Sequence, residues 1–271
     1  MTCIVSIIIP TYKPGEYLTS CLDSLCRQDA DASAFEVIIV LNGPLQGYRE
    51  QIETYISQHP EHQLRLLTTE VAGVSNARNV GLREAEGRFV GFIDDDDWVS
   101  QSYLRLLIEK AAGDDTIVCS NVKQIDDETH EEMSNYITDA YRRLLNSKSP
   151  SLFVGRSFLS SSCCKIIPRR AIGDARFDAR FALGEDSLFM FAVSSHIRQI
   201  TLASAECIYY IRARHSSASR SRMNYGRRLR NITLLCAAYT RTWLSHPFSY
   251  NLPLFLSRII ATLLKLFRRS Y

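Results

Sequence analysis

Short apolar runs alternate with amphipathic segments through the first 120 residues, and this alternation limits the folds open to the chain. The apolar runs are rich in β-branched residues and too short for buried helices, which predicts strands at 4–9, 35–43, 64–69, 88–93 and 115–122. Between them, apolar residues recur at helical spacing at 16–28, 51–59, 75–87 and 101–112, with Ser75 as N-cap and Gly87 as stop of the third helix. We therefore expect an α/β fold with a mostly parallel central sheet flanked by helices, which binds ligands at the carboxyl ends of its strands.

The fourth expected strand runs into four consecutive aspartates, Asp94–Asp97, followed by Trp98. On an extended backbone, residues two apart point to the same side, so the carboxylates of Asp94 and Asp96 would lie together. Paired carboxylate oxygens suit Mg²⁺ or Mn²⁺, which complete their shells with water and substrate phosphates. A solvated loop or a helix N-terminus also accommodates such acids, and the spacing does not match a calcium-binding loop. The position at a strand end favours a metal–diphosphate site, but the motif alone leaves both interpretations open.

Charge is distributed unevenly along the 271-residue chain. Residues 207–271 contain twelve Lys or Arg and no Asp or Glu, whereas residues 1–206 contain 20 basic and 29 acidic residues, a net charge of −9. An acidic body with a basic tail indicates an anionic partner surface, either lipid headgroups or nucleic acid. No nucleic-acid recognition module accompanies the charge, so we expect a membrane surface and no nucleic-acid partner.

The eight cysteines form no CxxC pair and no Cys/His cluster with zinc spacing. The opening residues MTCIVSIIIPTY lack the basic and apolar regions of a signal peptide. The sequence also has no uninterrupted run of about 18 apolar residues, so we expect no membrane span. These features predict reduced thiols in a cytoplasmic protein.

Six segments carry a more specific signal through their order and spacing. They are VSIIIPTYKPGEYLTSCLDSL, FEVIIVLNG, AGVSNARNVGLREAEGRFVGFIDDDDW, SSCCKIIPRRAI, RFDARFALGEDSLF and YYIRARHSSASRS. Over residues 4–222 this set resembles family 2 glycosyltransferases of the GT-A fold, in particular bacterial members that assemble polysaccharides. The resemblance implies a catalytic domain at 1–225, with a Rossmann-like nucleotide-sugar-binding half at 1–122 and an acceptor-side half at 123–225, followed by a helical extension at 226–271.

In this family the turn after the first strand meets the nucleoside, which implies donor contacts from Pro10, Thr11 and Tyr12. An aromatic ring there can stack on a base, and a hydroxyl can bond to it. Asn42 stands where the family usually has an acidic residue. Its amide can donate and accept toward a pyrimidine edge, although an Asn that only forms a turn has the same appearance. Arg78 matches the A-R-N segment of the family and is expected to counter the charge of the diphosphate or of the aspartates.

The resemblance also divides the aspartates by role. It implies Asp96 as the main ligand of Mn²⁺ or Mg²⁺, and Asp94 as a contact to the ribose or to the metal. Asp95 is expected beside the nucleotide-sugar, where it and Asp97 raise the local negative field. Trp98 is expected to close the turn by packing.

The stretch LGEDSLF at 183–189 supplies the catalytic acids that the resemblance implies. Asp186 is the expected general base, which takes the proton of an acceptor hydroxyl as that hydroxyl attacks the anomeric carbon. Glu185 is expected to orient the acceptor or a neighbouring group. An acidic pair that only begins a helix is the alternative for this stretch.

Further contacts are implied on the acceptor side and near the diphosphate. His215, together with Arg212 or Arg214, is expected to reach the diphosphate or the metal from a segment that closes over the substrate. Lys165 is an expected acceptor-side contact. A loop residue that faces solvent is the alternative for His215.

Residues 252–271, LPLFLSRIIATLLKLFRRSY, place Arg258, Thr262, Lys265 and Arg269 on one helical face, and the other faces are nearly all Leu, Ile and Phe. A narrow cationic stripe of this kind is typical of a helix that lies in the headgroup plane of an anionic membrane. The alternative is a helix docked on the catalytic body with its charges in water.

Together these features predict a metal-dependent inverting glycosyltransferase. It would transfer one sugar from a nucleoside diphosphate sugar, in the first instance a UDP-sugar, to a hydroxyl of a glycan or lipid-linked glycan at the inner face of the cell membrane. Two alternatives stay open: an inactive relative that binds nucleotide-sugar and scaffolds a glycan-assembly complex, and a sugar nucleotidyltransferase. The second requires a glycine-rich phosphate-binding loop after the first strand, and TYKPGEY meets that requirement poorly.

Overall fold

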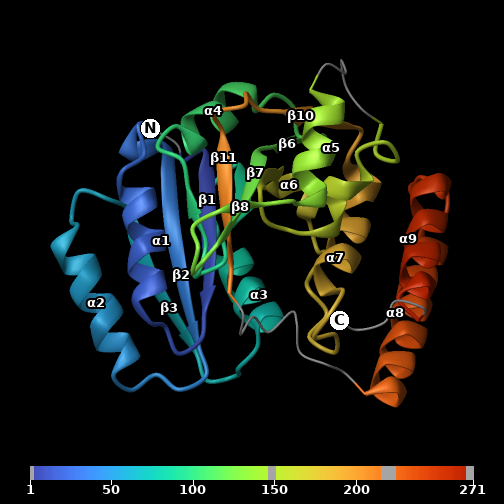
Figure 1. Ribbon diagram of the computed structural model, residues 1–271, viewed down its shortest axis with the longest axis horizontal. Coiled ribbons are helices and arrows are strands. Elements are labelled where there is room, and N and C mark those ends of the chain that lie inside the picture. Colours follow the sequence, from blue (N-terminus) through green and yellow to red (C-terminus); the bar gives the residue numbers. More distant parts are fainter. Residues whose placement is uncertain (1–2, 146–150, 215–223, 267–271) are drawn as a thin grey trace.

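The computed structural model describes residues 3–145, 151–214 and 224–266. Its centre is a seven-stranded sheet with the order β10-β6-β9-β4-β1-β2-β3 (Figure 1). The strands are β1 (Val5–Thr11), β2 (Phe35–Asn42), β3 (Leu64–Thr69), β4 (Phe89–Phe92), β6 (Thr116–Cys119), β9 (Lys165–Pro168) and β10 (Gln199–Leu202). Neighbouring strands are parallel, except that β9 is antiparallel to β4 and β6. The predicted α/β fold with a mainly parallel central sheet is confirmed.

Helices connect the strands and cover the sheet. They are α1 (Glu16–Cys26), α2 (Tyr48–Gln58), α3 (Val74–Glu84), α4 (Tyr103–Lys110), α6 (Arg169–Ile172) and α7 (Glu185–Val193). Every residue of β1 and β2 is buried, as expected for central parallel strands that are covered on both faces. The carboxyl ends of these two strands lie at the lower edge of the sheet in Figure 1, away from the N-terminus.

A second, four-stranded sheet has the order β5-β11-β7-β8. Its strands are β5 (Trp98–Val99), β7 (Asn121–Asp126), β8 (Glu132–Met133) and β11 (Ile208–Ala213), and α5 (Tyr136–Leu144) packs on β7. The single strand expected at 115–122 is therefore wrong: the chain changes sheets at Ser120, whose backbone N–H and hydroxyl both donate to the carbonyl of Cys164. Because apolar residues continue on both sides of Ser120, periodicity does not reveal the change of partner.

Helix α3 begins and ends elsewhere than expected. Gly73 is its N-cap, so Ser75 lies inside the first turn, where it is buried. The helix ends at Glu84, three residues before Gly87. Gly87 instead passes close to β1, because a Cβ atom at this position would lie 2.5 Å from the backbone nitrogen of Ser6. The glycine is needed for this close approach of backbones and does not stop the helix.

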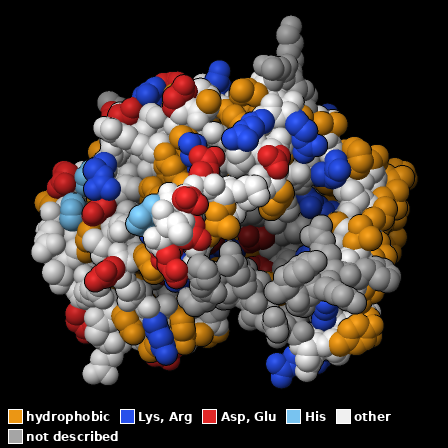
Figure 2. All heavy atoms as spheres, viewed as in Figure 1, with side chains coloured by type: hydrophobic (Ala, Val, Ile, Leu, Met, Phe, Trp, Pro, Cys, Tyr) orange, Lys and Arg blue, Asp and Glu red, His pale blue; other side chains and the backbone are white. Residues whose placement is uncertain are grey.

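The C-terminal part is a pair of helices, α8 (Tyr225–Ser245) and α9 (Leu252–Leu264), which pack on each other, with α8 against α7. The predicted orientation of the polar stripe is wrong: Arg258 and Thr262 are buried against the protein, while Lys265 is exposed and Arg269 lies outside the described residues. Hydrophobic side chains gather instead along the outer edge that these helices form (Figure 2). Among the described helices, none is long and apolar enough to cross a bilayer.

Candidate active site

A cavity of about 820 Å³ lies at the carboxyl ends of β1 and β2. Its walls come from these strand ends, the start of α3, the aspartates after β4, the start of α7 and the end of β11. The expected site residues that line it are Pro10, Tyr12, Asn42, Arg78, Asp94, Asp95, Asp96, Asp97, Glu185, Asp186, Arg212 and Arg214. Segments that the sequence assigns to a donor half and to an acceptor half therefore share one cavity.

The four aspartates form a tight turn and not an extended strand end. The backbone N–H of Asp97 donates to the carbonyl of Asp94 at 3.0 Å, so the simple alternation of side chains expected for Asp94 and Asp96 does not hold. Each carboxylate has a different partner: Asp94 binds Arg78, Asp95 accepts from Thr11, Asp96 pairs with Arg214, and Asp97 accepts from Tyr209 and from the backbone of Arg212. The turn is thus fixed from four directions.

Arg78 connects the two acidic groups of the site. Its guanidinium, with a side chain only 3% exposed, donates through Nη2 to Asp94 and through Nη1 to Asp186, each at 2.7 Å. Burial alone would lower the pKa of Arg78, but the charges of Asp186 and Asp94 outweigh burial and raise it. Arg78 therefore stays charged and holds the aspartate turn next to the start of α7. This role agrees with the expected countercharge for the aspartates.

Burial, and then neighbouring carboxylates, raises the pKa values of several acids in the site. Burial, followed by the charges of Asp96 and Asp94, raises the pKa of Asp95 to about 6. The same two causes, burial and then a neighbouring carboxylate, raise the pKa of Asp96. On α7, burial and then the charge of Asp186 raise the pKa of Glu185 to about 7. Burial and neighbouring carboxylates thus both oppose ionisation of these groups, and a cation would favour it.

The predicted nucleoside contacts lie at the ends of β1 and β2. Tyr12 is half exposed, and its ring packs over Gly43, where a Cβ atom would meet the ring at 2.6 Å. Asn42 is buried, and its amide donates to the carbonyl of Thr11 at 2.6 Å and accepts from the backbone of Gly73 at 2.8 Å. Asn42 therefore joins the end of β1 to the start of α3 from the wall of the cavity.

Arg212 holds the aspartate turn from β11. Its guanidinium carbon lies 4.6 Å from the ring centres of both Tyr17 and Trp98. It donates through Nε to the carbonyl of Asp96 at 2.9 Å and through Nη1 to Asp127 at 2.8 Å. With its side chain 16% exposed and bonded through Nε and Nη1, Arg212 positions the turn, and Trp98 packs as expected.

Residues 6–174 match the family model described as Glycosyl transferase family 2. The chain belongs to this family. Among curated proteins, the chain is 35% identical over 129 residues to the uncharacterized glycosyltransferase EpsJ of Bacillus subtilis. This match covers 47% of this chain and 36% of EpsJ. The chain is 26% identical over 218 residues to the poly(ribitol-phosphate) beta-N-acetylglucosaminyltransferase TarS of Staphylococcus aureus. This match covers 76% of this chain and 35% of TarS. The chain thus spans about a third of the length of these relatives.

Solved structures agree with the fold of this family 2 chain. The structure of S. aureus TarS 1-349 in complex with UDP-GlcNAc matches with a TM-score of 0.68 at 22% identity, and the match covers 87% of this chain and 66% of that one. The mannosyltransferase PcManGT from Pyrobaculum calidifontis, in complex with GDP-Man and Mn2+, matches with a TM-score of 0.60 at 17% identity and covers 97% and 76%. These likenesses support the GT-A fold.

A divalent cation fits the chemistry of this cavity. Six carboxylates and three guanidinium groups line it, which leaves an excess of hard, negatively charged oxygen atoms. Asp94 pairs with Arg78, and Asp96 pairs with Arg214. Within the described residues no three His, Cys, Asp or Glu side chains already form a complete cluster. Mg²⁺ and Mn²⁺ are commonly held by one or two carboxylates, with phosphate oxygens and water as the other ligands, and the carboxylates of this cavity fit that mode of binding.

Two expected contacts have different outcomes in this family 2 chain. Lys165 is 1% exposed, and its ammonium group donates to the backbone carbonyls of Ser161 and Cys163, so the expected acceptor-side contact is wrong. Lys165 begins β9, and the two carbonyls satisfy the charge of its buried side chain, where no acceptor can reach it. His215 lies outside the described residues.

Two residues of the site, Ser162 and Tyr209, were not predicted from the sequence. Ser162 donates to the Oδ1 atom of Asp186 at 3.1 Å, and Tyr209 donates to Asp97 at 2.8 Å while accepting from the backbone of Asp94 at 3.1 Å. Ser162 lies in an SSCC stretch without a recognisable spacing signal, and Tyr209 is one of many apolar residues of β11. Their roles depend on contacts between distant segments.

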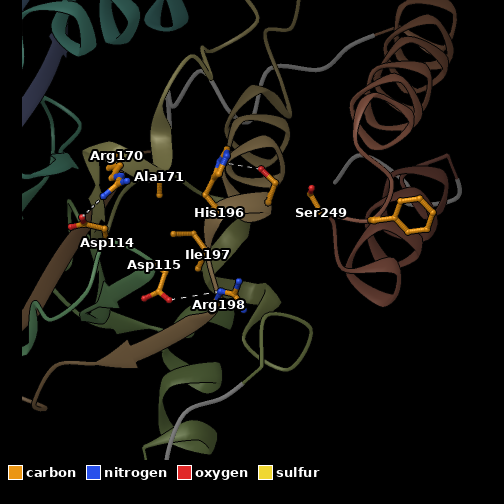
Figure 3. Close-up of a pocket in the computed structure, with 10 residues that line it drawn as sticks. Asp114, Asp115, Arg170, Ala171, His196, Ile197, Arg198 and Ser249 are labelled. Atoms are coloured by element: carbon orange, nitrogen blue, oxygen red, sulfur yellow. Dashed lines mark hydrogen bonds and ion pairs between the residues drawn. The ribbon is translucent and has the colours of Figure 1, made fainter.

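A second cavity, of about 1000 Å³, lies elsewhere, near α6 and the connection between α8 and α9. Figure 3 shows that its charged side chains face one another: Arg170 pairs with Asp114, and Arg198 with Asp115. None of its lining residues belongs to the aspartate turn. Because these surface charges already compensate each other, this cavity is a weaker candidate for a functional site.

Proposed function

We propose that this chain is a metal-dependent inverting glycosyltransferase that uses a nucleoside diphosphate sugar, with a UDP-sugar as the first candidate. The observation that carries the proposal is the bridge of Arg78 between Asp94 and Asp186. Arg78 binds both Asp94, in the proposed metal and diphosphate site, and Asp186, the candidate base, although these two aspartates are 92 residues apart in the sequence. The complex of TarS with UDP-GlcNAc supports the choice of donor.

Asp186 is the proposed general base. Both Arg78 and Ser162 bond to its Oδ1 atom, so among the described contacts its Oδ2 atom stays available to an acceptor hydroxyl. Oδ2 would accept the hydroxyl proton as the oxygen attacks the anomeric carbon from the side opposite the departing diphosphate, which inverts the configuration. Glu185, the neighbour of Asp186 on the cavity wall, would orient the acceptor.

The aspartate turn would hold Mn²⁺ or Mg²⁺ through Asp96 and Asp94, and the cation would neutralise charge that develops on the leaving diphosphate. Tyr12 would stack on the nucleobase, and its half-exposed ring at the cavity wall supports this role. Arg214, which pairs with Asp96, would exchange this carboxylate for a phosphate oxygen of the donor.

The proposed acceptor is a hydroxyl of a cell-surface glycan or lipid-linked glycan, at the cytoplasmic face of the membrane. Two curated relatives support a role in polysaccharide assembly through their names, TarS and the minor teichoic acid biosynthesis protein GgaB of B. subtilis. GgaB is 26% identical over 217 residues, 79% of this chain and 23% of its own length.

A thermal-shift panel of UDP, GDP, CDP and dTDP, each with Mn²⁺ or with EDTA, tests the donor site. A ligand at 100 times its dissociation constant stabilises the fold by about 2.7 kcal/mol, so one nucleotide should raise the melting temperature, and only with metal. Asp96→Ala should remove this metal-dependent shift. An equal shift in the variant would exclude Asp96 from the site, and no shift with any nucleotide would contradict the proposal.

Turnover separates the alternatives that remain. Release of UDP from a UDP-sugar in the presence of an acceptor supports the transferase. Nucleotide binding without turnover over a panel of sugars and acceptors would indicate an inactive scaffold, and release of pyrophosphate would indicate a nucleotidyltransferase.

A further inference from the structure

Six hydrophobic side chains are exposed together on α9 and on the connection that precedes it. They are Phe248, Leu252, Leu256, Ile260, Leu263 and Leu264, and we call them the apolar ridge. Phe248 is fully exposed, and the others are 44–55% exposed. Figure 2 shows hydrophobic side chains along this edge of the molecule. Large continuous apolar patches are rare on the free surface of soluble proteins and indicate a binding surface.

The buried side of α9 determines that the ridge faces outward. Leu254, Arg258 and Thr262 recur every four residues and are buried. Leu256 and Ile260 follow Leu254 and Arg258 by two residues, which is a rotation of about 200° around the helix and places them on the opposite face. Helical periodicity groups these residues in the same way, but the sequence interpretation expected the polar stripe to face outward.

Arg258 fixes this rotation of the helix. Its Nη2 atom donates to the backbone carbonyl of Arg156 at 2.8 Å, and the hydroxyl of Thr262 donates to the carbonyl of Arg258 at 2.7 Å. Turning α9 by half a revolution would break the bond to Arg156 and expose Leu254, which is completely buried. The apolar ridge is therefore held outward by specific contacts.

Charge indicates what covers the ridge. Residues 207–271 contain twelve basic and no acidic residues, and Arg227, Arg230 and Arg241 of α8 are exposed beside α9. In a symmetric dimer through the ridge, the same cationic segment of both copies would meet, with no carboxylate from either segment to compensate. An anionic membrane offers an apolar interior to the ridge and negative headgroups to the exposed arginines.

We propose that the apolar ridge inserts into the interfacial region of an anionic bilayer, with α9 parallel to the membrane plane and its polar side against the catalytic body. This deepens the membrane location in the proposed function and rests on it. An interfacial helix usually places its polar side in water. Here the protein itself covers that side, so α8 and α9 attach the transferase domain rigidly to the surface.

Vesicle sedimentation tests the proposal with the full chain. The wild type should bind vesicles of phosphatidylglycerol and phosphatidylethanolamine, and bind phosphatidylcholine vesicles at least about tenfold more weakly, because basic residues add attraction to anionic lipid. Leu256→Ser combined with Ile260→Ser should lower binding to the anionic vesicles at least about tenfold without any change in charge. Met133→Ser, which removes an exposed apolar side chain from β8, is the matched control and should bind like the wild type.

Two further measurements make the outcome decisive. Circular dichroism melting and the nucleotide thermal shift should be unchanged in the double variant, which shows an intact fold and donor site. Light scattering with size-exclusion chromatography should report a monomer for both proteins. Unchanged vesicle binding in the double variant, no binding by the wild type, or a wild-type dimer that the double variant dissociates would each overturn the proposal. A failed nucleotide shift with normal vesicle binding would count against the donor site alone.

Discussion

Glu185→Gln tests the electrostatics of the site through the stability of the fold. Burial, and then the charge of Asp186, raises the pKa of Glu185 from 4.5 to about 7 in the folded protein. One pKa unit corresponds to about 1.4 kcal/mol, so ionised Glu185 costs the native state about 3 kcal/mol relative to its protonated form. Water at the cavity mouth screens part of this charge, and we expect about 2 kcal/mol in practice.

The sign follows from proton linkage. Below pH 4.5 Glu185 is protonated in both the folded and the unfolded states, and no penalty exists. As the pH rises through 4.5 toward 7, the unfolded state loses its proton first, and the folded protein loses stability until both states are ionised above pH 7. Glutamine resembles the protonated glutamate at every pH, so the variant escapes this loss. The loss of a negative charge from the first turn of α7 offsets the gain by about 0.5 kcal/mol.

The assay is urea denaturation at pH 5 and pH 8, in EDTA and without nucleotide. Glu185→Gln should be more stable than the wild type by about 1.5 kcal/mol at pH 8 and nearly equal to it at pH 5. Glu131→Gln, at an exposed position on the far side of β7, controls for the general effect of removing one negative charge. A variant that gains no stability at pH 8, or gains the same amount at both pH values, would refute the assignment of a raised pKa to Glu185.

Two other variants address catalysis and donor binding. Asp186→Asn should lower kcat by about 10²-fold or more while the nucleotide thermal shift stays the same, because a general base contributes about 10²–10⁴-fold. Asp174→Asn, at an exposed position, is the control, and an unchanged kcat in Asp186→Asn would assign the base elsewhere. Gly43→Ala should destabilise the fold and weaken nucleotide binding, because its φ is +86° and the new Cβ atom would displace Tyr12. Gly47→Ala has a similar φ of +80° but open space around the Cβ atom, so equal nucleotide affinities in the two variants would exclude a role of Tyr12 in binding.

The arrangement of the catalytic body follows from local sequence to a large extent. Runs such as VSIIIPT and FEVIIVLN are β-branched, apolar and short, and only burial inside a sheet suits them. Their alternation with helices requires parallel pairing, and parallel pairing places Asn42 and the aspartates at one edge. Therefore the location of the site, and its acidic character, could be predicted without coordinates.

The contacts within the site depend on tertiary structure, because they join side chains that are far apart in the chain. Nothing near Arg78 in the sequence shows that it bridges Asp94 and Asp186. The same holds for the aspartates, whose geometry comes from a turn held by β11 and not from strand alternation.

The tail shows the division between sequence and tertiary structure most clearly. Helical periodicity by itself determines that Arg258 and Thr262 share one face and that leucines and isoleucines cover the other. Which face turns inward depends on the surface offered by other elements, and here a carbonyl of Arg156 accepts from Arg258, while Phe255 of α9 stacks on Trp243 of α8. The sequence therefore determined that this helix has two unlike sides, and the tertiary structure decided that the apolar side faces outward, because a helix turns inward the side that its packing partners can satisfy.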